Sequence, residues 1–580
     1  MAPPRELRTA APGRPQWSPG AVSVNGPGYN HRGVCHSVYR KTFHVSLVKL
    51  SELIAAVPAA TFPNSGDPEI TAVVEDSRHV TPGALFVARR GRELDGHAFI
   101  LAALQAGAAA IVGELAVGEL PDACAEMTIP YVQASDGAAA VGQLAAALHG
   151  FPARKLVMIG VTGTDGKTTT CSLIHSILRA ASIRAGLITT VNTEIGAEVM
   201  DTGFHVTTPD AAAVQGFLAR MVAAGMTHCV LEATSHGLAQ QRVAACEFDL
   251  AVVTNITHEH LDYHGSLDAY LKAKAMLFDS LAFAAPKTGV SKLAVLNRDD
   301  DQSYEYLRER LQVDYADYGL QSSAATYADH IRSEGAGTRF DVQTDGKRFS
   351  VETALPGEYN VANCLAAIVA TRNGLGIAIE SVKAGIATMR AIAGRMERIN
   401  LGQDFEAVVD FAHTPNSLRE LLRAVRKENA GRIIVVFGSA GLRDVAKRSW
   451  MGSVAAQLAD IAVITAEDPR TESLADIMAE IAAGCAKMGG VEGETFWQLA
   501  DRADAIRFAV GLAGPGDVVL ACGKAHEQSM CFGAEEYLWD DRVAMRAAVA
   551  ERVGKSVPVP PLLPTAAAFT GSARAELTGG

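Results

Sequence analysis

One segment constrains the fold of this chain more than any other. The apolar run "KLVMIGV" leads into the glycine turn "TGTDGKTTT", and the helical pattern "CSLIHSILRAA" follows. A strand that passes through such a turn into a helix is typical of parallel α/β sheets. Gly163 and Gly166 leave backbone N–H groups accessible at the helix N-terminus, where the helix dipole favours anions. Lys167 can reach terminal phosphate oxygens and the Thr168 hydroxyl can bind Mg²⁺, so the turn predicts a nucleoside triphosphate site despite its non-standard glycine spacing.

Apolar runs along the chain fall into three consecutive series. Short runs such as "ALFVA" and "AAIVG" alternate with helical patterns over residues 45–150, and the βαβ alternation recurs over residues 151–392 and 393–555. We therefore expect three consecutive α/β domains, with a central P-loop-type parallel-sheet ATPase domain and a Rossmann-like C-terminal domain. The composition of residues 1–44 superficially matches an organellar transit peptide, but it favours a disordered leader or a misassigned start codon. Residues 556–580 indicate a flexible tail.

Composition excludes several classes of protein. The formal net charge of −12 gives no general electrostatic grip on nucleic acid. Nine cysteines without a CxxC pair argue against a disulfide framework or a zinc site, and favour a reducing cytoplasm. No segment offers the roughly 18 consecutive apolar residues that a membrane span needs, and no secretory signal is evident. We expect a cytoplasmic protein with no nucleic-acid or membrane partner.

Carboxylate and imidazole side chains follow two of the later apolar runs. Glu232 ends the run "HCVLEA", where its carboxylate can complete a magnesium shell with Thr168. The segment "TNITHEHLDYHG" places His258, His260 and His264 after the next run. Imidazoles at these spacings also suit zinc, but no cysteine is nearby and a neighbouring phosphate site favours a hard cation. Magnesium is therefore the preferred ion.

The motifs together resemble the Mur ligase family, and within it the muramoyl-tripeptide synthetases (MurE). The resemblance covers about residues 45 to 552 and rests on motifs that occur in family order. They are "TGTDGKTTT", "EATSHGL", "NITHEHLDYHG", "AKAMLF", "GEYNVANCLAA", "GRMERI", "DFAHTPNSL", "EDPRTE" and "GKAHE".

The resemblance implies an ATP-dependent amide ligase of peptidoglycan biosynthesis. Such an enzyme adds a diamino acid to UDP-N-acetylmuramoyl-L-alanyl-D-glutamate through an acyl phosphate, and uses ATP and two Mg²⁺ ions. The physical logic agrees, because a carboxylate cannot readily attack ATP unless cations neutralise the phosphates. The family default is a monomer, and residues 45–150 would bind the UDP substrate.

The resemblance also implies roles for residues around the triphosphate. Lys167, Glu232, His260 and Lys274 would be catalytic, with Lys274 carbamylated so that it becomes an anionic ligand. The metal ligands would be Thr168, Glu232, His260 and Lys274. ATP would contact Gly163, Thr164, Asp165, Gly166, Lys167, Thr168, Thr169, Asn363, Arg395 and Asp410, with Asn363 at the adenine.

Two further sets follow from the resemblance. The UDP-muramoyl dipeptide would contact Ser77, Thr207, Thr208, Thr234, Gln240 and Arg242, whereas the matches at Arg92, Glu93 and Leu94 depart from the family. The incoming amino acid would contact Arg443, Glu467, Asp468, Pro469, Arg470, Gly523 and Glu527.

The identity of the diamino acid stays open in the sequence. Relatives that add meso-diaminopimelate commonly carry D-N-P-R, whereas this chain has E-D-P-R. Arg470 suits a distal carboxylate, but Glu467 and Asp468 can attract a distal ammonium. Meso-diaminopimelate, L-lysine and L-ornithine are all compatible with this pattern.

Two other functions remain possible for the same motifs. One is another amide ligase of the superfamily, such as a cyanophycin or folylpolyglutamate synthetase, although the N-terminal domain and "TSHGLAQQR" favour the muramoyl substrate. The other is a noncatalytic nucleotide-regulated binding module. Lys167, Glu232, His260 and Lys274 are all present, which argues against a loss of catalysis.

Overall fold

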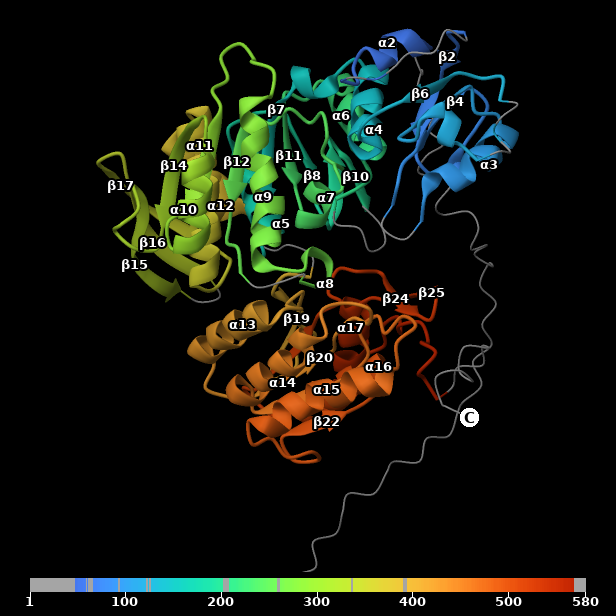
Figure 1. Ribbon diagram of the computed structural model, residues 1–580. Helices are drawn as coiled ribbons and strands as arrows, with labels where there is room; N and C mark the ends of the chain where they lie inside the picture. The colour runs from blue at the N-terminus through green and yellow to red at the C-terminus, as the bar shows by residue number, and fades with distance from the viewer. Residues whose placement is uncertain are drawn as a thin grey trace, which may run out of the picture. The chain divides into compact units, whose positions relative to one another are not determined.

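The computed structural model describes residues 47–58, 60, 66–91, 94–121, 124, 127–201, 208–257, 261–334, 337–389 and 394–567. Three main sheets follow one another along the chain (Figure 1). The expected leader, residues 1–44, lies outside the described residues. Among the described residues, no helix combines the length and the apolar character that crossing a membrane requires.

The N-terminal sheet has four parallel strands in the order β3-β4-β5-β6. They are β3 (Ala72–Val74), β4 (Ala84–Ala88), β5 (Ala110–Gly113) and β6 (Tyr131–Gln133). Every residue of "ALFVA" is buried, as expected for a strand covered on both faces. The helices are α2 (Leu50–Ile54), α3 (Ile100–Gln105) and α4 (Gly137–Leu148), and β1 (Val48–Lys49) pairs antiparallel with β2 (Glu69–Ile70).

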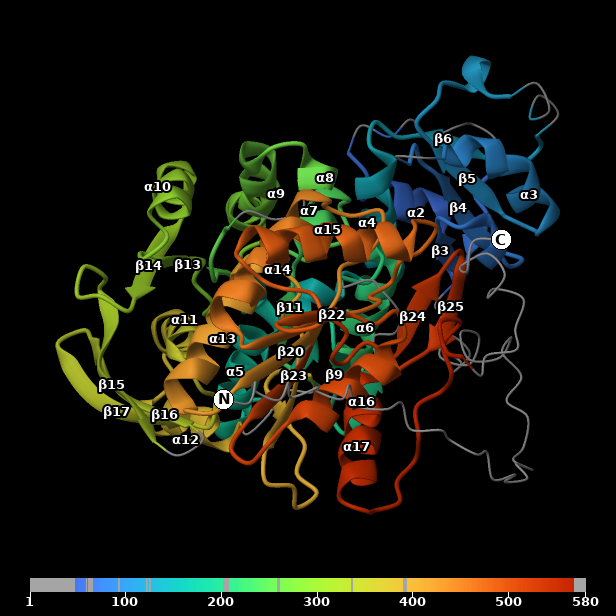
Figure 2. The ribbon, with the colours of Figure 1, turned by 90° about the horizontal axis from the view of Figure 1, so that it is seen from below.

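The central sheet has eleven strands in the order β10-β9-β8-β11-β7-β12-β13-β14-β15-β16-β17. The middle of the sheet is parallel and consists of β8, β11, β7, β12, β13, β14 and β15. Antiparallel hairpins form both ends, and Figures 1 and 2 show β15, β16 and β17 together at one of them. The strands are β7 (Val157–Thr162), β8 (Ala185–Ile188), β9 (Asn192–Ile195), β10 (Glu198–Asp201), β11 (His228–Glu232), β12 (Leu250–Val253), β13 (Leu293–Asn297), β14 (Asp314–Gly319), β15 (Thr326–Glu334), β16 (Gly337–Thr344) and β17 (Lys347–Thr353).

Helices cover both faces of this sheet. Apolar side chains of α5, α11 and α12 form one buried core with the strands, and those of α6, α9 and α10 form a second core. The helices are α5 (Lys167–Ala180), α6 (Ala211–Ala223), α7 (Ser235–Ala239), α8 (Leu261–His264), α9 (Leu267–Asp279), α10 (Asp301–Arg310), α11 (Glu358–Leu375) and α12 (Ile379–Thr388). Two separate cores are what a doubly covered sheet requires.

The C-terminal sheet has six strands in the order β18-β19-β23-β20-β21-β22, parallel except for β18. The strands are β18 (Glu397–Arg398), β19 (Glu406–Asp410), β20 (Ile433–Phe437), β21 (Ile461–Ile464), β22 (Phe496–Gln498) and β23 (Val518–Cys522), with a separate hairpin of β24 (Ser529–Phe532) and β25 (Glu535–Leu538). The helices are α13 (Pro415–Glu428), α14 (Ala446–Leu458), α15 (Leu474–Lys487), α16 (Arg502–Leu512) and α17 (Asp541–Arg552).

The fold class predicted from the sequence, consecutive α/β units with parallel sheets, is confirmed. The C-terminal tail differs from the expectation over residues 556–567. Leu563 is only 1% exposed within the C-terminal core, and the Thr565 hydroxyl donates to Asp501 over 2.9 Å. Only residues 568–580 of the expected tail lie outside the described residues.

Candidate active site

The glycine turn between β7 and α5 is built as a narrow backbone cradle. Gly163 has φ +144°, and a Cβ there would lie 1.8 Å from Thr254 Oγ1. Gly166 has φ +82°, and its Cβ would lie 2.3 Å from Asn363 Oδ1. Only glycine fits both positions, because a side chain is excluded by contact and by conformation. The first N–H groups of α5 have no intrahelical acceptors and lie at the positive end of the helix dipole, as anion binding requires.

Asn255, two residues after the end of β12, holds this turn in place. The Thr164 N–H donates to the Asn255 carbonyl over 2.6 Å, and the Asp165 N–H donates to Asn255 Oδ1 over 3.0 Å. Lys167 Nζ donates to the Thr164 carbonyl over 2.7 Å, which bends its ammonium back over the turn. A phosphate entering the cradle would therefore meet a cation as well as backbone donors.

Glu232 and Thr168 meet directly beside the turn. Glu232 ends β11, is only 2% exposed, and its Oε2 accepts from Thr168 Oγ1 over 2.9 Å and from the Thr190 N–H over 3.1 Å. A carboxylate and a hydroxyl oxygen in contact beside a phosphate cradle are hard ligands suited to Mg²⁺. The donor set present here therefore fits a magnesium ion.

Lys274 lies under the same turn. It projects from α9, is 1% exposed, and its Nζ donates to the Gly163 carbonyl over 2.5 Å. Its ammonium also lies 4.4 Å from the centre of the Tyr270 ring. Lysine is almost never fully buried without a partner, so this position sets Lys274 apart from an ordinary helix lysine. Lys272, two residues earlier, is 62% exposed and pairs with Asp268 on the surface.

Thr208, which precedes α6, and three polar residues after β11 form one hydrogen-bonded network. Thr208 Oγ1 bonds to the Glu232 carbonyl over 3.2 Å and to Thr234 Oγ1 over 3.1 Å. Arg242 donates to the Thr208 carbonyl over 2.8 Å and to Gln240 Oε1 over 2.6 Å. The network begins at Glu232, so it joins the metal-binding candidate to the polar groups expected to bind the muramoyl dipeptide.

In the C-terminal region, Lys524 binds two of the residues that are predicted to contact the incoming amino acid. Its Nζ lies 2.9 Å from both carboxylate oxygens of Asp468 and also binds Glu527. Burial alone would lower the pKa of Lys524, but the nearby carboxylates of Glu527 and Asp468 outweigh this effect and raise it. Asp468 Oδ1 accepts from the Cys531 N–H as well, over 2.9 Å. Asp468 is therefore already held by an ammonium and a backbone N–H inside the protein.

Glu467 and Arg470 differ from Asp468 in this respect. Burial raises the pKa of Glu467, and Lys447 opposes the shift. The buried Glu467 Oε2 has no hydrogen-bond partner among the described residues, and it lies 2.2 Å from where a Cβ of Gly523 would be. The Arg470 guanidinium forms no ion pair or hydrogen bond with the part of the chain that the structure describes. An unpaired carboxyl and an unpaired guanidinium are thus open to a ligand with both charges.

Arg395 and Asp410 lie close together beside an aromatic cluster. The Arg395 guanidinium lies 4.5 Å from the Phe411 ring centre, and the Phe411 ring lies 4.7 Å from that of His526. Both His526 nitrogens are buried without a hydrogen-bond partner among the described residues. Burial, with Arg395 next in effect, lowers the pKa of His526 to about 3. His526 is therefore a neutral imidazole whose two nitrogens remain to be satisfied.

Three family models match this chain in succession. They are described as the Mur ligase family catalytic domain at residues 69–149, the Mur ligase middle domain at residues 161–371, and the Mur ligase glutamate ligase domain at residues 394–525. A UDP-N-acetylmuramyl-tripeptide synthetase of Roseiflexus sp. (strain RS-1) is 42% identical over 493 residues, which is 84% of this chain and 95% of the relative. The chain belongs to the Mur ligase family.

Further relatives agree with this membership. A UDP-N-acetylmuramoyl-L-alanyl-D-glutamate–2,6-diaminopimelate ligase of Geobacillus thermodenitrificans is 38% identical over 507 residues, covering 87% of this chain and 100% of the relative. A solved structure of a ligase with the same name is 29% identical, has a TM-score of 0.59 and covers 88% of this chain and 100% of that one. A MurF structure from Acinetobacter baumannii, 20% identical with a TM-score of 0.60 and the same coverage, shares the fold.

The structure of this Mur ligase brings together many residues that the sequence singled out. Thr164, Thr168, Glu232, Asn363 and Lys274 surround one turn. Thr169 is buried in the first turn of α5, and Ser77 begins a short 3₁₀ turn after β3. Thr207, His258, His260, Arg92 and Glu93 lie outside the described residues.

Sequence reasoning missed several residues of these clusters. Tyr270, Thr254 and Asn255 support the glycine turn. Thr254 and Asn255 begin the quoted segment "TNITHEHLDYHG", so a signal was available for them, whereas nothing in the sequence context of Tyr270 distinguishes it from an ordinary core residue. Lys524 and His526 lie within the quoted motif "GKAHE", so the signal was available although only Gly523 and Glu527 were selected.

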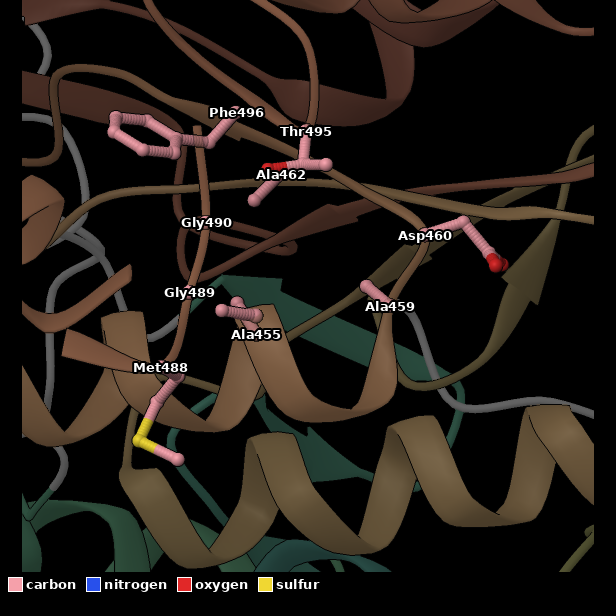
Figure 3. A pocket seen from close by; sticks show the side chains of 10 residues that line it. Ala455, Ala459, Asp460, Ala462, Met488, Gly489, Gly490, Thr495 and Phe496 are labelled. Atoms are coloured by element: carbon pink, nitrogen blue, oxygen red, sulfur yellow. The ribbon is translucent and has the colours of Figure 1, made fainter. Parts of the chain in front are cut away.

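A small hollow on the C-terminal region lies apart from these groups (Figure 3). Its volume is about 110 Å³, and alanine and glycine make up most of its lining. Its only carboxylate, Asp460, is already bound by Arg426 over 2.5 Å. The hollow is too small and has too few free polar groups for a nucleotide or a diamino acid.

Proposed function

We propose that this chain is an ATP-dependent ligase that joins a diamino acid to UDP-N-acetylmuramoyl-L-alanyl-D-glutamate in peptidoglycan biosynthesis. The proposal rests above all on the turn where Gly163, Gly166, Lys167, Thr168, Glu232 and Lys274 meet. Relatives that match over nearly their whole length carry this activity in their names. The reaction would take place in the cytoplasm, and the chain would act as a monomer.

The chemistry follows from mutual repulsion between the reactants. The D-glutamate carboxylate of the substrate attacks the γ-phosphorus of ATP, which gives an acyl phosphate and releases ADP. The amine of the incoming amino acid then attacks the acyl carbon, an amide bond forms, and phosphate and a proton leave. The backbone cradle and Lys167 hold the phosphates while the two anions approach each other.

We assign the metal ligands to four residues. Thr168 and Glu232 would hold one Mg²⁺, and His260 with carbamylated Lys274 would complete a second site. Bound Mg²⁺ supplies charge neutralisation at the phosphates. The Lys274 ammonium first loses a proton to give the free amine, and the nitrogen then bonds to the carbon of carbon dioxide with loss of a second proton. The cation is thereby replaced by a carbamate anion, which removes the repulsion that a buried ammonium would exert on a metal.

The remaining assignments follow the three regions of the chain. Residues 45–150 would bind the UDP moiety, including Ser77. Residues 151–392 would bind ATP and the dipeptide, the latter through the Thr208–Thr234–Gln240–Arg242 network and Thr207. Residues 393–555 would contribute Arg395 and Asp410 to the nucleotide. This last region would also supply the amino acid site, namely Arg443, Glu467, Asp468, Pro469, Arg470, Gly523 and Glu527.

The diamino acid is expected to contact Glu467 and Arg470 most directly. Asp468 is already paired with Lys524, so it is less available than Glu467 to a ligand ammonium. Glu467 and Arg470 offer one acceptor and one donor group. A ligand with an ammonium and a carboxylate at its distal end, or with an α-amino acid group held there, can satisfy both.

A single assay tests the proposal. Purified protein is incubated with ATP, Mg²⁺ and the UDP-muramoyl dipeptide. Separate reactions contain meso-diaminopimelate, L-lysine or L-ornithine, and mass spectrometry identifies the nucleotide products. We expect tripeptide product, ADP and phosphate in equal amounts with one of the three. ATP binding without any product would instead support a noncatalytic module, and turnover only with a folate or a cyanophycin primer would support another ligase.

A further inference from the structure

A cavity of about 630 Å³ lies in the central region. Its walls come from α5, the β8–β9 hairpin and the end of α12, and none of the proposed site residues lines it. Its volume is several times that of the hollow in Figure 3 and falls within the range of ligand pockets. Polar side chains converge on it from two elements.

One wall is a single face of the phosphate-turn helix. Ser172, His175, Ser176 and Arg179 line the cavity at helical spacings of three and four, so they share one side of α5. The two hydroxyls are already engaged, since Ser172 donates to the Thr168 carbonyl over 2.8 Å and Ser176 donates to the Gly385 carbonyl over 2.7 Å. His175 and Arg179 therefore carry the chemistry of this wall.

His175 and Glu194 face each other as two hydrogen-bond acceptors. His175 Nε2 lies 3.1 Å from the Ala185 carbonyl and must donate to it. Burial lowers the pKa of His175, although Glu194 opposes the shift, so Nδ1 carries a lone pair. Glu194 Oε2 lies 3.8 Å from that Nδ1, while its other oxygen accepts from Asn192 over 3.0 Å. Two acceptors at this separation call for a donor that bonds to both.

Arg179 adds the opposite charge at the cavity. Its side chain is exposed, and its guanidinium makes no ion pair or hydrogen bond with any residue in the described ranges. A guanidinium binds a carboxylate through two parallel hydrogen bonds. The cavity thus offers a place for a donor cation and a separate place for an anion.

We propose that this cavity binds a small zwitterion of the amino acid class, with its ammonium between His175 and Glu194 and its carboxylate on Arg179. The site lies next to the groups that hold Glu232. Asn192 lines the cavity, and its carbonyl accepts from the Thr189 hydroxyl. Thr190, which follows Thr189 in the chain, donates its N–H to Glu232 over 3.1 Å. Occupation of the cavity is therefore expected to change the apparent affinity for Mg²⁺–ATP.

Ligand-observed NMR on the full chain tests the binding. Glycine, L-alanine, L-glutamate and L-lysine are titrated into the wild type and into Arg179→Gln and Glu194→Gln, with Lys383→Gln and Glu380→Gln as matched controls on the exposed part of α12. We expect at least one probe to bind with a Kd of about 10 mM or tighter. Each cavity variant should weaken it by about fivefold or more, and the controls should not.

Two further measurements distinguish binding in this cavity from binding at the proposed amino acid site. The Arg470→Ala variant should keep the binding that Arg179→Gln weakens, because the two arginines belong to different regions. Acetate and methylamine, which carry one charge each, should bind more weakly than the zwitterion. Equal binding to the wild type and both cavity variants overturns the proposal, and so does the absence of binding by every probe at about 50 mM. Unchanged melting temperatures verify that the variants are folded.

Discussion

At the scale of single residues, burial distinguishes two lysines of α9 that look alike in the sequence. Lys272 pairs with Asp268 at the surface, whereas Lys274 is 1% exposed and bonds to the carbonyl of Gly163. Burying an ammonium costs several kcal/mol unless polar groups compensate. In this structure the Gly163 carbonyl and the Tyr270 ring lie against the buried Lys274 ammonium, directly beside the glycine turn.

Replacing Lys274 by alanine should lower kcat by roughly a hundredfold or more, because a charged group close to the transferred phosphate is lost. Steady-state ligation with and without added bicarbonate measures the effect. Bicarbonate should not restore activity, since alanine has no amine to carbamylate. Lys272→Ala is the matched control and should retain near wild-type activity. Near-normal turnover by Lys274→Ala would remove this lysine from the mechanism.

Arg470→Ala should raise KM for the amino acid by roughly tenfold and leave KM for ATP unchanged. The reason is that the free guanidinium of Arg470 is available to a ligand carboxylate, whereas no proposed nucleotide contact depends on it. Initial rates at varied amino acid and varied ATP separate the two constants. Arg546→Ala, an exposed arginine on α17, serves as the control. An unchanged KM for the amino acid would count against the assignment.

At the scale of elements, the strand–turn–helix unit explains why glycine stands at two places. Gly166 adopts a left-handed conformation at the N-cap of α5, and Asn363 from α11 lies directly over it. The turn, its helix and α11 thus fit together as one rigid unit. The helix that follows the glycine turn also forms one wall of the cavity lined by His175 and Arg179, so the proposed ATP site and the proposed zwitterion site share an element.

Gly166→Ala should raise KM for ATP by about tenfold, because strain at φ +82° and contact with Asn363 Oδ1 together cost about 1 to 3 kcal/mol. Gly289→Ala is the control, since Gly289 has φ +76° but nothing within 4 Å of its Cβ position. ATP titration by fluorescence or kinetics checks the effect. Equal KM values for both variants would mean that Asn363 does not constrain the turn.

At the scale of the whole molecule, buried ion pairs and a short C-terminal segment complete the last core. Arg502 and Asp541 are both fully buried and lie 2.7 Å apart, and Arg502 also donates to the carbonyl of Cys522, next to Gly523. Leu563 adds a buried apolar side chain from beyond α17. These contacts fix the strand end from which the proposed amino acid site projects.

Asp541→Asn should lower the free energy of unfolding at pH 7 by about 3 to 5 kcal/mol, because Arg502 is left without its buried partner. Burial alone would raise the pKa of Asp541, but the charge and hydrogen bonds of Arg502 outweigh burial and lower this pKa below 3.8. The contribution of the pair is therefore complete above about pH 4 and is lost as the pH falls through the lower folded-state value. Urea unfolding at several pH values should show the difference between the two proteins shrinking in acid.

The control for this pair is Glu551→Gln on the same helix. Glu551 is 59% exposed and pairs with Arg507, so its loss should change stability by less than about 0.5 kcal/mol. A difference between wild type and Asp541→Asn that stays constant from pH 7 to pH 3 would contradict the linkage.

Leu563→Ala should destabilise the protein by about 2 to 4 kcal/mol, because a buried leucine is replaced by a cavity. Leu562→Ala should have almost no effect, since Leu562 is 54% exposed. Thermal or urea unfolding compares the two neighbours directly. Equal stability of both variants would show that the segment after α17 does not pack on the core in solution.

The sequence by itself determined the parallel α/β class, the phosphate turn and the family, because apolar periodicity and short motifs are local properties of the chain. Tertiary structure alone decided which of two α9 lysines is buried, that Lys524 pairs with Asp468, and that Leu563 joins a core. It alone also placed His175 opposite Glu194. These outcomes depend on which groups meet across distant segments, and burial and charge pairing have no signature in the order of neighbouring residues.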